Sequence, residues 1–254
     1  MKNSIKKLIV GIVAGCALST AAIARDNKTY TYEVSITNLT NAAFLSEPVV
    51  AIHKHGFKLF ELGQVNASPG LEVVAETGSP TVLVDELSVN ADVSTVRYMM
   101  GTAPNGGLIP GETVTETFEA SKEFSHVSVY AMIAPSNDAF VSANAVHGPR
   151  NGKSVTIFSP AYDAGTEANN ERCDTTPGGV TGDDPDSIPV PPPMRPMICV
   201  FNPTIPFPAG LQNQVGGPVL ISRGFQGVGD LNPAMFDWRN PTAKIVIKRV
   251  KTER

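Results

Sequence analysis

The sequence predicts an all-β protein, an antiparallel β-sandwich, and three features lead to this prediction. Short runs in which apolar and polar residues alternate recur along the chain, as in strands with one buried and one exposed face. Clusters of turn-forming residues separate these runs. The 22 glycines and 21 prolines interrupt the chain too often for long helices. Many short strands with little helix are typical of two packed antiparallel sheets.

The expected strands are distributed along most of the chain. The first covers Tyr30–Ile36, where every second residue is apolar. The others are expected at Val49–His53, Thr113–Ala120, His126–Ala134, Val155–Ser159, Val219–Ser222 and Ala243–Val250. One short helix is expected at Leu71–Ala75, and Gly78 can end it.

Residues 164–217 differ in composition from the rest. They contain Gly178-Gly179, the acidic run Asp183–Asp186 and a proline-rich run from Pro189 to Pro196. Such a composition favours extended, poorly packing chain. Because strand-like sequence resumes afterwards, we interpret the segment as a loop-rich insertion within one domain that covers residues 25–254.

Residues 1–24 are typical of a signal peptide. Three lysines within the first seven residues precede the apolar run Leu8–Leu18, and Ala22-Ile23-Ala24 supplies a cleavage site. The run is too short for a membrane-spanning helix. Val13–Cys16 also resembles a lipobox, which would place a lipid on Cys16, although the polar tether typical of lipoproteins does not follow. Either route predicts export, so the protein is expected to be secreted or periplasmic.

The composition of the exported part limits its partners. Removal of residues 1–24 takes away three lysines and no acids, so the formal net charge changes from −4 to −4 − 3 = −7. No basic stripe with interleaved aromatic residues remains, which argues against nucleic acid as a partner. Cys173 and Cys199 are the two cysteines left. In an exported protein this even number favours a disulfide over two free thiols.

Three acidic side chains lie close to strand ends. Asp138 follows the strand that ends at Ala134, Asp163 follows the strand that ends at Ser159, and Glu119 belongs to the strand that precedes the Asp138 strand. Calcium takes several oxygens from carboxylates, carbonyls and water. Loops at one end of a sandwich can supply such oxygens from distant parts of the chain. The spacing alone is equally compatible with acids that serve only their own turns.

Other patterns indicate chemistry less strongly. His53 and His55 could hold a transition metal, because residues i and i+2 share one face of a strand, but no cysteine or acid lies near them in sequence. His126 and His147 are isolated in the sequence. No nucleophile elbow or phosphate-binding loop occurs. The enzyme alternative is a secreted hydrolase that uses two of the three acids, but one tryptophan and five tyrosines argue against a sugar-binding cleft.

Four motifs, in the same order, resemble the spondin N-terminal domain family. They include a strand and loop with a Pro-Ser-x-Asp run and a Tyr-Asp-Ala-Gly-Thr-acid segment. The motifs lie at His53 with Phe57–Gly63 and Ser68–Gly78, at Ile133–Val141, at Tyr162–Glu167, and at Asp237–Pro241 with the strand after it. The resemblance covers roughly Tyr32 to Val250.

The resemblance implies a C2-like sandwich that binds calcium. It implies that Asp138 and Asp163, which fall on the aspartates of two family motifs, are metal ligands together with Glu119. Glu167 is a weaker candidate that could instead orient the loop. We therefore expect a calcium-binding module without catalytic residues, and a purely structural sandwich without metal is the alternative.

The animal relatives, F-spondins and mindins, are extracellular-matrix and cell-adhesion proteins. Their resemblance implies a role in adhesion, or in binding an extracellular or envelope protein or glycan. Ala139 and Ser142 replace an aromatic residue and a glycine of the animal motif, and the proline-rich insertion is absent from those members. The resemblance therefore does not imply that this chain binds the receptors of the animal proteins.

Overall fold

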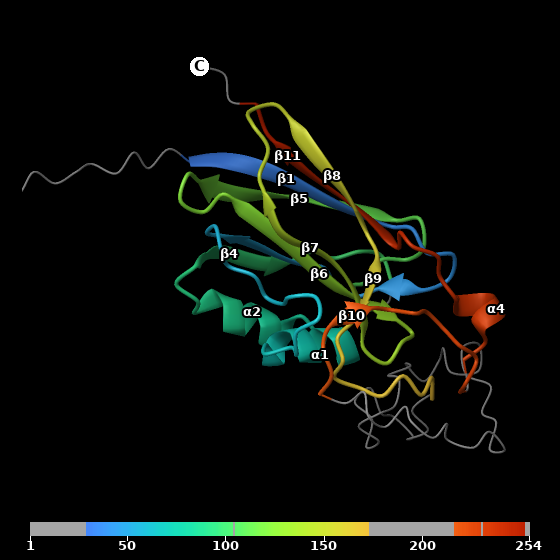
Figure 1. The fold of residues 1–254 in the computed structure, drawn as a ribbon. Coiled ribbons are helices and arrows are strands. Elements are labelled where there is room, and N and C mark those ends of the chain that lie inside the picture. Colours follow the sequence, from blue (N-terminus) through green and yellow to red (C-terminus); the bar gives the residue numbers. More distant parts are fainter. Residues whose placement is uncertain (1–28, 104, 173–215, 230, 252–254) are drawn as a thin grey trace, which may run out of the picture.

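The computed structural model describes residues 29–103, 105–172, 216–229 and 231–251, which form two packed antiparallel sheets (Figure 1). The predicted signal peptide, Cys16, Cys173, Cys199 and most of the proline-rich insertion lie outside the described residues. The described parts of that insertion, 164–172 and 216–217, contain no helix or strand.

The four-stranded sheet is built from both ends of the described chain. Its order is β5 (Thr113–Ser121), β1 (Thr29–Asn38), β11 (Ala243–Arg249) and β8 (Ser154–Ser159). The larger sheet has the order β10 (Leu220–Ile221), β9 (Ala161–Asp163), β7 (Ala139–His147), β6 (His126–Ala134), β3 (Val49–His53) and β4 (Val93–Tyr98), and β2 (Phe44–Leu45) pairs with β6. The predicted all-β sandwich is confirmed, and each of the seven expected strands is present, the one at 219–222 as the two-residue β10.

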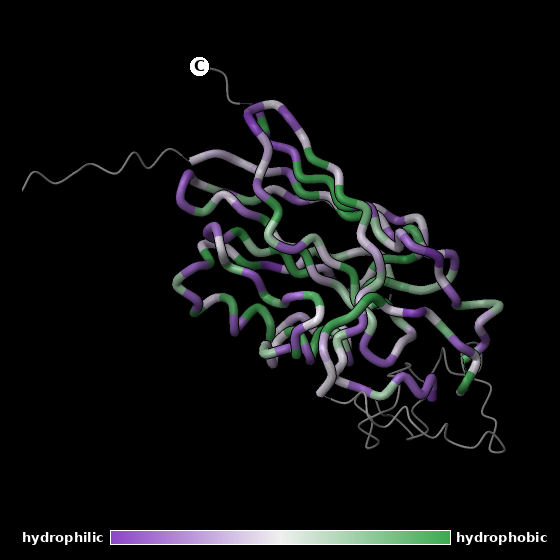
Figure 2. The backbone as a smooth tube through the Cα atoms, viewed as in Figure 1, coloured by the Kyte–Doolittle hydropathy of each residue, from purple (hydrophilic) through white to green (hydrophobic). Residues whose placement is uncertain are grey.

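Alternation in β1 separates the core from solvent. Tyr32, Val34 and Ile36 are at most 1 % exposed, whereas the residues between them are only half-buried. Val34 lies opposite Ile247, so apolar side chains of the first and last strands share the inner face. Burying each such side chain stabilises the fold by roughly 2 kcal/mol. Figure 2 shows hydrophobic segments along the interior strands and hydrophilic residues in the connecting turns.

The outer face of the seven-stranded sheet is also buried, because two helices cover it (Figure 1). Eight of the nine residues of β6 are therefore buried, and its alternation is lost. Helix α1 (Pro69–Thr77) confirms the predicted helix, and it ends at Gly78 with φ 74°. Leu71 of this helix is fully buried in the second core cluster, which lies between the helices and the sheet.

The expectation of a single helix was wrong, since α2 (Thr81–Ser88) and the one-turn α4 (Pro233–Phe236) are also present. Helix α2 has no side-chain cap at its N-terminus and contains β-branched residues, so its local sequence favours helix weakly. Leu83 and Leu87 are buried against the sheet, and this packing holds the helix. Strands β4, β7, β9 and β2 were also not predicted.

Glu86 of α2 binds the N-terminus of α1. The Ser68 hydroxyl accepts a hydrogen bond from the Leu71 N–H at 3.0 Å and donates one to the Glu86 carboxylate at 2.9 Å. The same carboxylate accepts the Gly70 N–H at 2.7 Å. The N-cap therefore also joins the two helices.

Ser68→Ala is expected to lower the free energy of unfolding by about 1 kcal/mol. The substitution removes the hydrogen bond from the Leu71 N–H and the hydrogen bond to the Glu86 carboxylate. Urea unfolding measures the loss. Ser88→Ala is the matched control, since the Ser88 hydroxyl is exposed and bonds only the Asp85 carbonyl within its own helix. Equal effects of the two substitutions would contradict the role of the cap.

Candidate functional site

Two loops carrying acids meet where β7 pairs with β9. Ala139, the first residue of β7, lies opposite Asp163, the last residue of β9. The Ala164 N–H donates to the Asp138 carbonyl at 3.2 Å, which joins the loops just beyond the strands. The sheet pairing therefore places Asp138 and Asp163 side by side.

Asp138 is fully buried, and its two carboxylate oxygens differ. Oδ2 accepts the backbone N–H groups of Thr166 at 2.8 Å and Glu167 at 3.3 Å, and it also bonds the Thr166 hydroxyl at 3.4 Å. Oδ1 is buried and has no hydrogen-bond partner among the described residues. A buried acceptor without a partner costs roughly 1–3 kcal/mol, and more when it is charged.

Asp163 is held by the turn that follows it. Its Oδ1 accepts the Gly165 N–H at 2.9 Å, and its Oδ2 accepts the Asn169 side-chain amide at 2.7 Å. Gly165 has φ 71°, and a Cβ there would lie 2.6 Å from the Gly217 carbonyl oxygen. Only glycine fits this turn, which directs the following backbone N–H groups toward Asp138.

Negative charge accumulates at this pair. Burial and, to a lesser degree, the Asp163 carboxylate raise the pKa of Asp138 to about 7, although the hydrogen bonds from Thr166 and Glu167 oppose the shift. Burial also raises the pKa of Asp163. Glu76, near the end of α1, adds a further repulsive charge on Asp138. No lysine or arginine of the described chain forms an ion pair with either aspartate. The pair thus requires a proton or a cation.

Glu167 lies in the same turn, but its side chain takes part in a hydrogen-bond network with neighbouring loop residues. It is buried, and its carboxylate accepts the Asn137 amide at 3.3 Å. That amide also donates to the side-chain oxygen of Asn170 at 3.1 Å, and the Glu171 N–H donates to Oδ1 of the Asn137 side chain at 3.1 Å. Glu167 therefore contributes to loop geometry beside the aspartates.

The structure does not bring Glu119 to the aspartates, so this part of the predicted ligand set is corrected. Glu119 lies opposite Thr31 in the four-stranded sheet and is exposed, because the inward positions beside it are taken by Phe118 and Ala120. β5 ends on the side of the molecule where β1 begins, whereas β9 lies on the other side (Figure 1). Glu76, which reaches the pair from α1, was not identified from the sequence, since no spacing relates a helix end to these loops.

Among the described residues, no group of three or more His, Cys, Asp or Glu side chains is arranged to hold a metal ion. Asp138 and Asp163 supply two carboxylates, one with an unpartnered oxygen. Calcium also takes carbonyl oxygens and water as ligands, so two carboxylates can be enough to start a calcium site. The residues present therefore fit a hard cation better than a transition metal.

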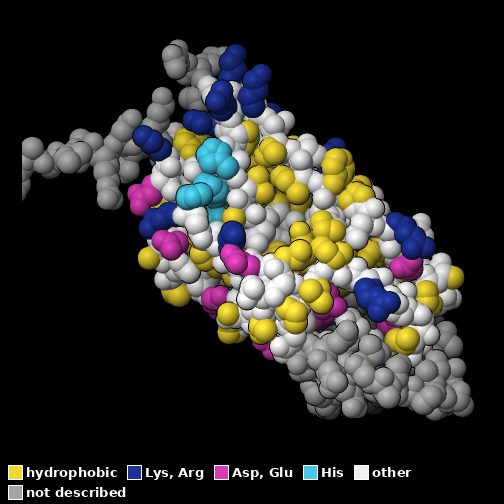
Figure 3. Space-filling model, in the orientation of Figure 1, with side chains coloured by type: hydrophobic (Ala, Val, Ile, Leu, Met, Phe, Trp, Pro, Cys, Tyr) yellow, Lys and Arg dark blue, Asp and Glu magenta, His cyan; other side chains and the backbone are white. Residues whose placement is uncertain are grey.

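All four histidines gather at the opposite end of the seven-stranded sheet, although His126 and His147 are isolated in the sequence. His126 lies opposite His53 on β3 and opposite His147 on β7. The His55 ring reaches the same place, and its Nδ1 lies 3.3 Å from Nε2 of His126. Figure 3 shows exposed histidines together on one face. His53 itself is buried, and its ring nitrogens contact the Ser128 hydroxyl and the Lys54 carbonyl.

The buried His126 makes stability depend on pH. Burial, and then the neighbouring histidines, lower its pKa to about 4. The unfolded chain therefore binds more protons than the folded protein between about pH 6.5 and pH 4, and stability is lost as the pH falls through this window. The expected loss is at most about 3 kcal/mol.

His126→Gln is expected to reduce this loss in urea unfolding between pH 7.5 and pH 4.5. His147→Gln is the control, because that ring is exposed and should leave most of the pH dependence in place. The same pH dependence in His126→Gln and in the unmodified protein would refute the assignment.

No helix within the described residues is long and apolar enough to cross a membrane. Comparison with protein families gives one match, the Spondin_N family, over residues 32–171, more than half of the chain. This range contains Asp138, Asp163 and the helices that cover the larger sheet. No curated protein matches the chain.

Proposed function

The chain belongs to the spondin N-terminal domain family, and from this we propose that it is an exported module that binds calcium through Asp138 and Asp163. The bound ion would order one end of the sandwich, which binds an extracellular or envelope partner in adhesion. The observation that carries the calcium proposal is the buried Asp138 Oδ1, which has no partner among the described residues.

Asp138 and Asp163 would each offer one carboxylate to the calcium ion. Asp138 would offer Oδ1, because its Oδ2 is already engaged by backbone N–H groups. Asp163 would offer a second carboxylate, held in place by Gly165 and Asn169. Backbone carbonyls and water would supply the remaining oxygens. Glu76 adds negative charge that favours a cation at this place.

Calcium would act mainly by stabilising the folded state. A ligand that binds only the folded protein adds about 2.7 kcal/mol at a hundred times its Kd. At this site it would also remove the repulsion between the buried Asp138 carboxylate and the half-buried Asp163 carboxylate. The loops on both sides of the pair would then form a fixed surface at the end of the sandwich.

The adhesion part of the proposal rests on the family and on the predicted signal peptide. Secretion or transfer to the periplasm would place the module where calcium is available and where matrix or envelope proteins and glycans are its neighbours. We propose no catalytic role, since the two aspartates are engaged in hydrogen bonds that hold the loops together.

Asp138→Asn is expected to abolish the rise in melting temperature that calcium produces in protein first treated with EDTA. The asparagine oxygen can still accept the Thr166 and Glu167 N–H groups, so the loop should fold without the charge. Asp85→Asn is the control, because it removes an exposed acid of α2 and should leave the calcium effect unchanged. No calcium effect in the unmodified protein would refute the site.

Single substitutions of the other candidate acids test which of them bind calcium. Asp163→Asn should weaken calcium binding at least tenfold in calorimetry, and Glu167→Gln should weaken it less, since Glu167 supports the loop. Glu119→Gln should bind calcium as the unmodified protein does, because Glu119 lies in the other sheet. A large effect of Glu119→Gln would show that the spatial assignment is wrong.

The calcium effect should depend on pH. Because the folded pKa of Asp138 is raised to about 7, the metal-free protein retains a proton that the unfolded chain releases, and stability from this group falls as the pH rises from about 4 to about 7. Calcium replaces that proton. Its stabilisation, measured as the shift in melting temperature, should therefore be larger at pH 8 than at pH 5.5, and an equal shift at both values would contradict this linkage.

A further inference from the structure

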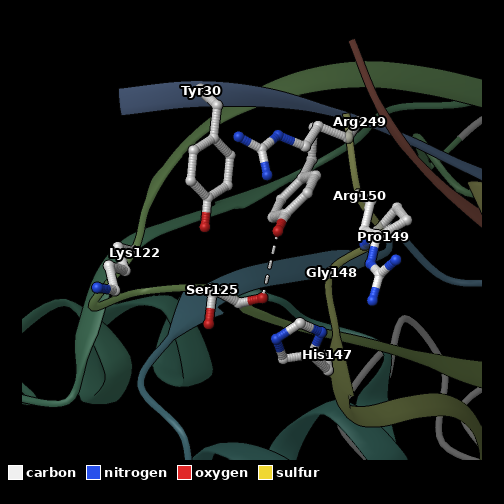
Figure 4. Close-up of a pocket in the computed structure, with 9 residues that line it drawn as sticks. Tyr30, Lys122, Ser125, His147, Gly148, Pro149, Arg150 and Arg249 are labelled. Carbon is white, nitrogen blue, oxygen red and sulfur yellow. Dashed lines mark hydrogen bonds between the residues drawn. The ribbon is translucent and has the colours of Figure 1, made fainter. Parts of the chain in front are cut away.

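A second polar site lies at the end of the sandwich away from the aspartates. A cavity of about 300 Å³ opens between the two sheets, where β1 begins and β11 ends. Tyr30, Arg249, Lys122, Ser125 and Arg150 are among its lining residues (Figure 4). Neither the calcium proposal nor the family match explains this cavity.

Strand register directs an arginine into the cavity. Arg249 lies opposite Tyr32, whose side chain is on the inner face of the four-stranded sheet together with that of Tyr30. The Arg249 guanidinium stacks 3.7 Å from the centre of the Tyr30 ring. This contact fixes the plane of the guanidinium.

The opposite wall is equally well defined. The Gly148 N–H donates to the Ser125 carbonyl at 2.8 Å, and the Tyr32 hydroxyl donates to the same carbonyl at 3.4 Å. A Cβ at position 148 would lie 1.8 Å from the Tyr32 hydroxyl oxygen, so only glycine allows the chain to pass here. The cavity therefore has a wall held by backbone contacts.

The charge of the cavity is positive and unbalanced. Lys122, Arg150 and Arg249 line it, no Asp or Glu does, and no described acid forms an ion pair with these three residues. Glu119 is exposed and lines a separate depression, and Oε1 of Glu123 lies 3.7 Å from Nζ of Lys54. Such a group is unexpected in a chain with a net charge of −4.

One donor of this group has no partner. Nε of Arg249 is buried and makes no hydrogen bond among the described residues. An unpaired buried donor costs free energy, and an oxyanion that enters the cavity would satisfy it with a charge-assisted hydrogen bond. Lys122 and Arg150 lie on opposite sides of the opening, where they would attract the anion (Figure 4).

We propose that this cavity binds a small oxyanion of the phosphate or sulfate type. Arg249 holds the anion through its Nε–H, and Lys122 and Arg150 balance its second charge. His147 also lines the cavity, where its ring offers a further N–H donor. Three cations favour a dianion over chloride, because each adds an attractive interaction with both charges.

Calorimetric titration of the purified protein with sodium sulfate and with sodium phosphate, at constant ionic strength in sodium chloride, tests the proposal. Saturable one-to-one binding is expected. Lys122→Gln with Arg150→Gln should weaken it at least tenfold, and both residues are exposed, so the fold should be kept. Lys58→Gln with Arg239→Gln removes two exposed cations elsewhere and should have no effect. No saturable binding, or an equal loss in both double variants, would overturn the proposal.

Arg249→Lys tests whether the Nε–H of Arg249 contributes to anion binding beyond its positive charge. It keeps the positive charge but removes the Nε–H, so binding should weaken at least fivefold while the far-ultraviolet circular dichroism spectrum remains unchanged. Binding as tight as that of the unmodified protein would overturn the role of the Arg249 Nε–H.

Galactose 6-sulfate, a monoanion, and glucose 6-phosphate, a dianion, distinguish the sources of the anion, with galactose as the uncharged control. Tighter binding of an ester than of the inorganic ion would support an anion carried by a sugar. Equal binding would support the free ion. Binding of galactose as tight as that of the esters would overturn an oxyanion site.

Discussion

The antiparallel pairing of β7 with β9 is the constraint on which the candidate site depends. It places Ala139 opposite Asp163, and thereby brings Asp138 beside a second carboxylate in a region that α1 and the larger sheet keep from water. The turn at Gly165 then directs backbone N–H groups to one oxygen of Asp138 and leaves the other without a partner. Asp138 is buried beside the half-buried Asp163, and the two carboxylates repel each other when both are charged. The proposed cation would compensate this repulsion.

Much of the fold could be predicted because the four-stranded sheet has one solvent-facing side. Its strands keep their period of two, so β1, β5, β8 and β11 are visible in the sequence. β7 was missed because Ala, Ser and Asn occupy much of it, and α2 was missed because tertiary packing, rather than its local sequence, holds it. Asp138 and Asp163 were identified through family motifs. Glu119 was misplaced because spacing does not reveal which sheet a strand joins, and the contacts of His126 required a register that no motif supplies.

The two ends of the sandwich differ in electrostatic character. Acids meet at the end that carries Asp138 and Asp163, whereas Lys122, Arg150 and Arg249 gather at the other end, next to the histidines. Among the described residues, four buried side-chain polar atoms have no hydrogen-bond partner, and each proposed site contains one of them, the acceptor Asp138 Oδ1 in one and the donor Arg249 Nε in the other. An apolar core lies between them, so the two proposed ions would bind at separate places.

The proposed calcium ion has one defined position, and a crystal structure of the protein grown with calcium would locate it. If calcium binds as proposed, the crystal will show density for calcium within about 2.3–2.6 Å of Asp138 Oδ1 and of an Asp163 oxygen, with an anomalous signal at that position. Calcium bound elsewhere, or a calcium-saturated crystal in which Asp138 Oδ1 contacts only protein atoms or water, would contradict the proposal.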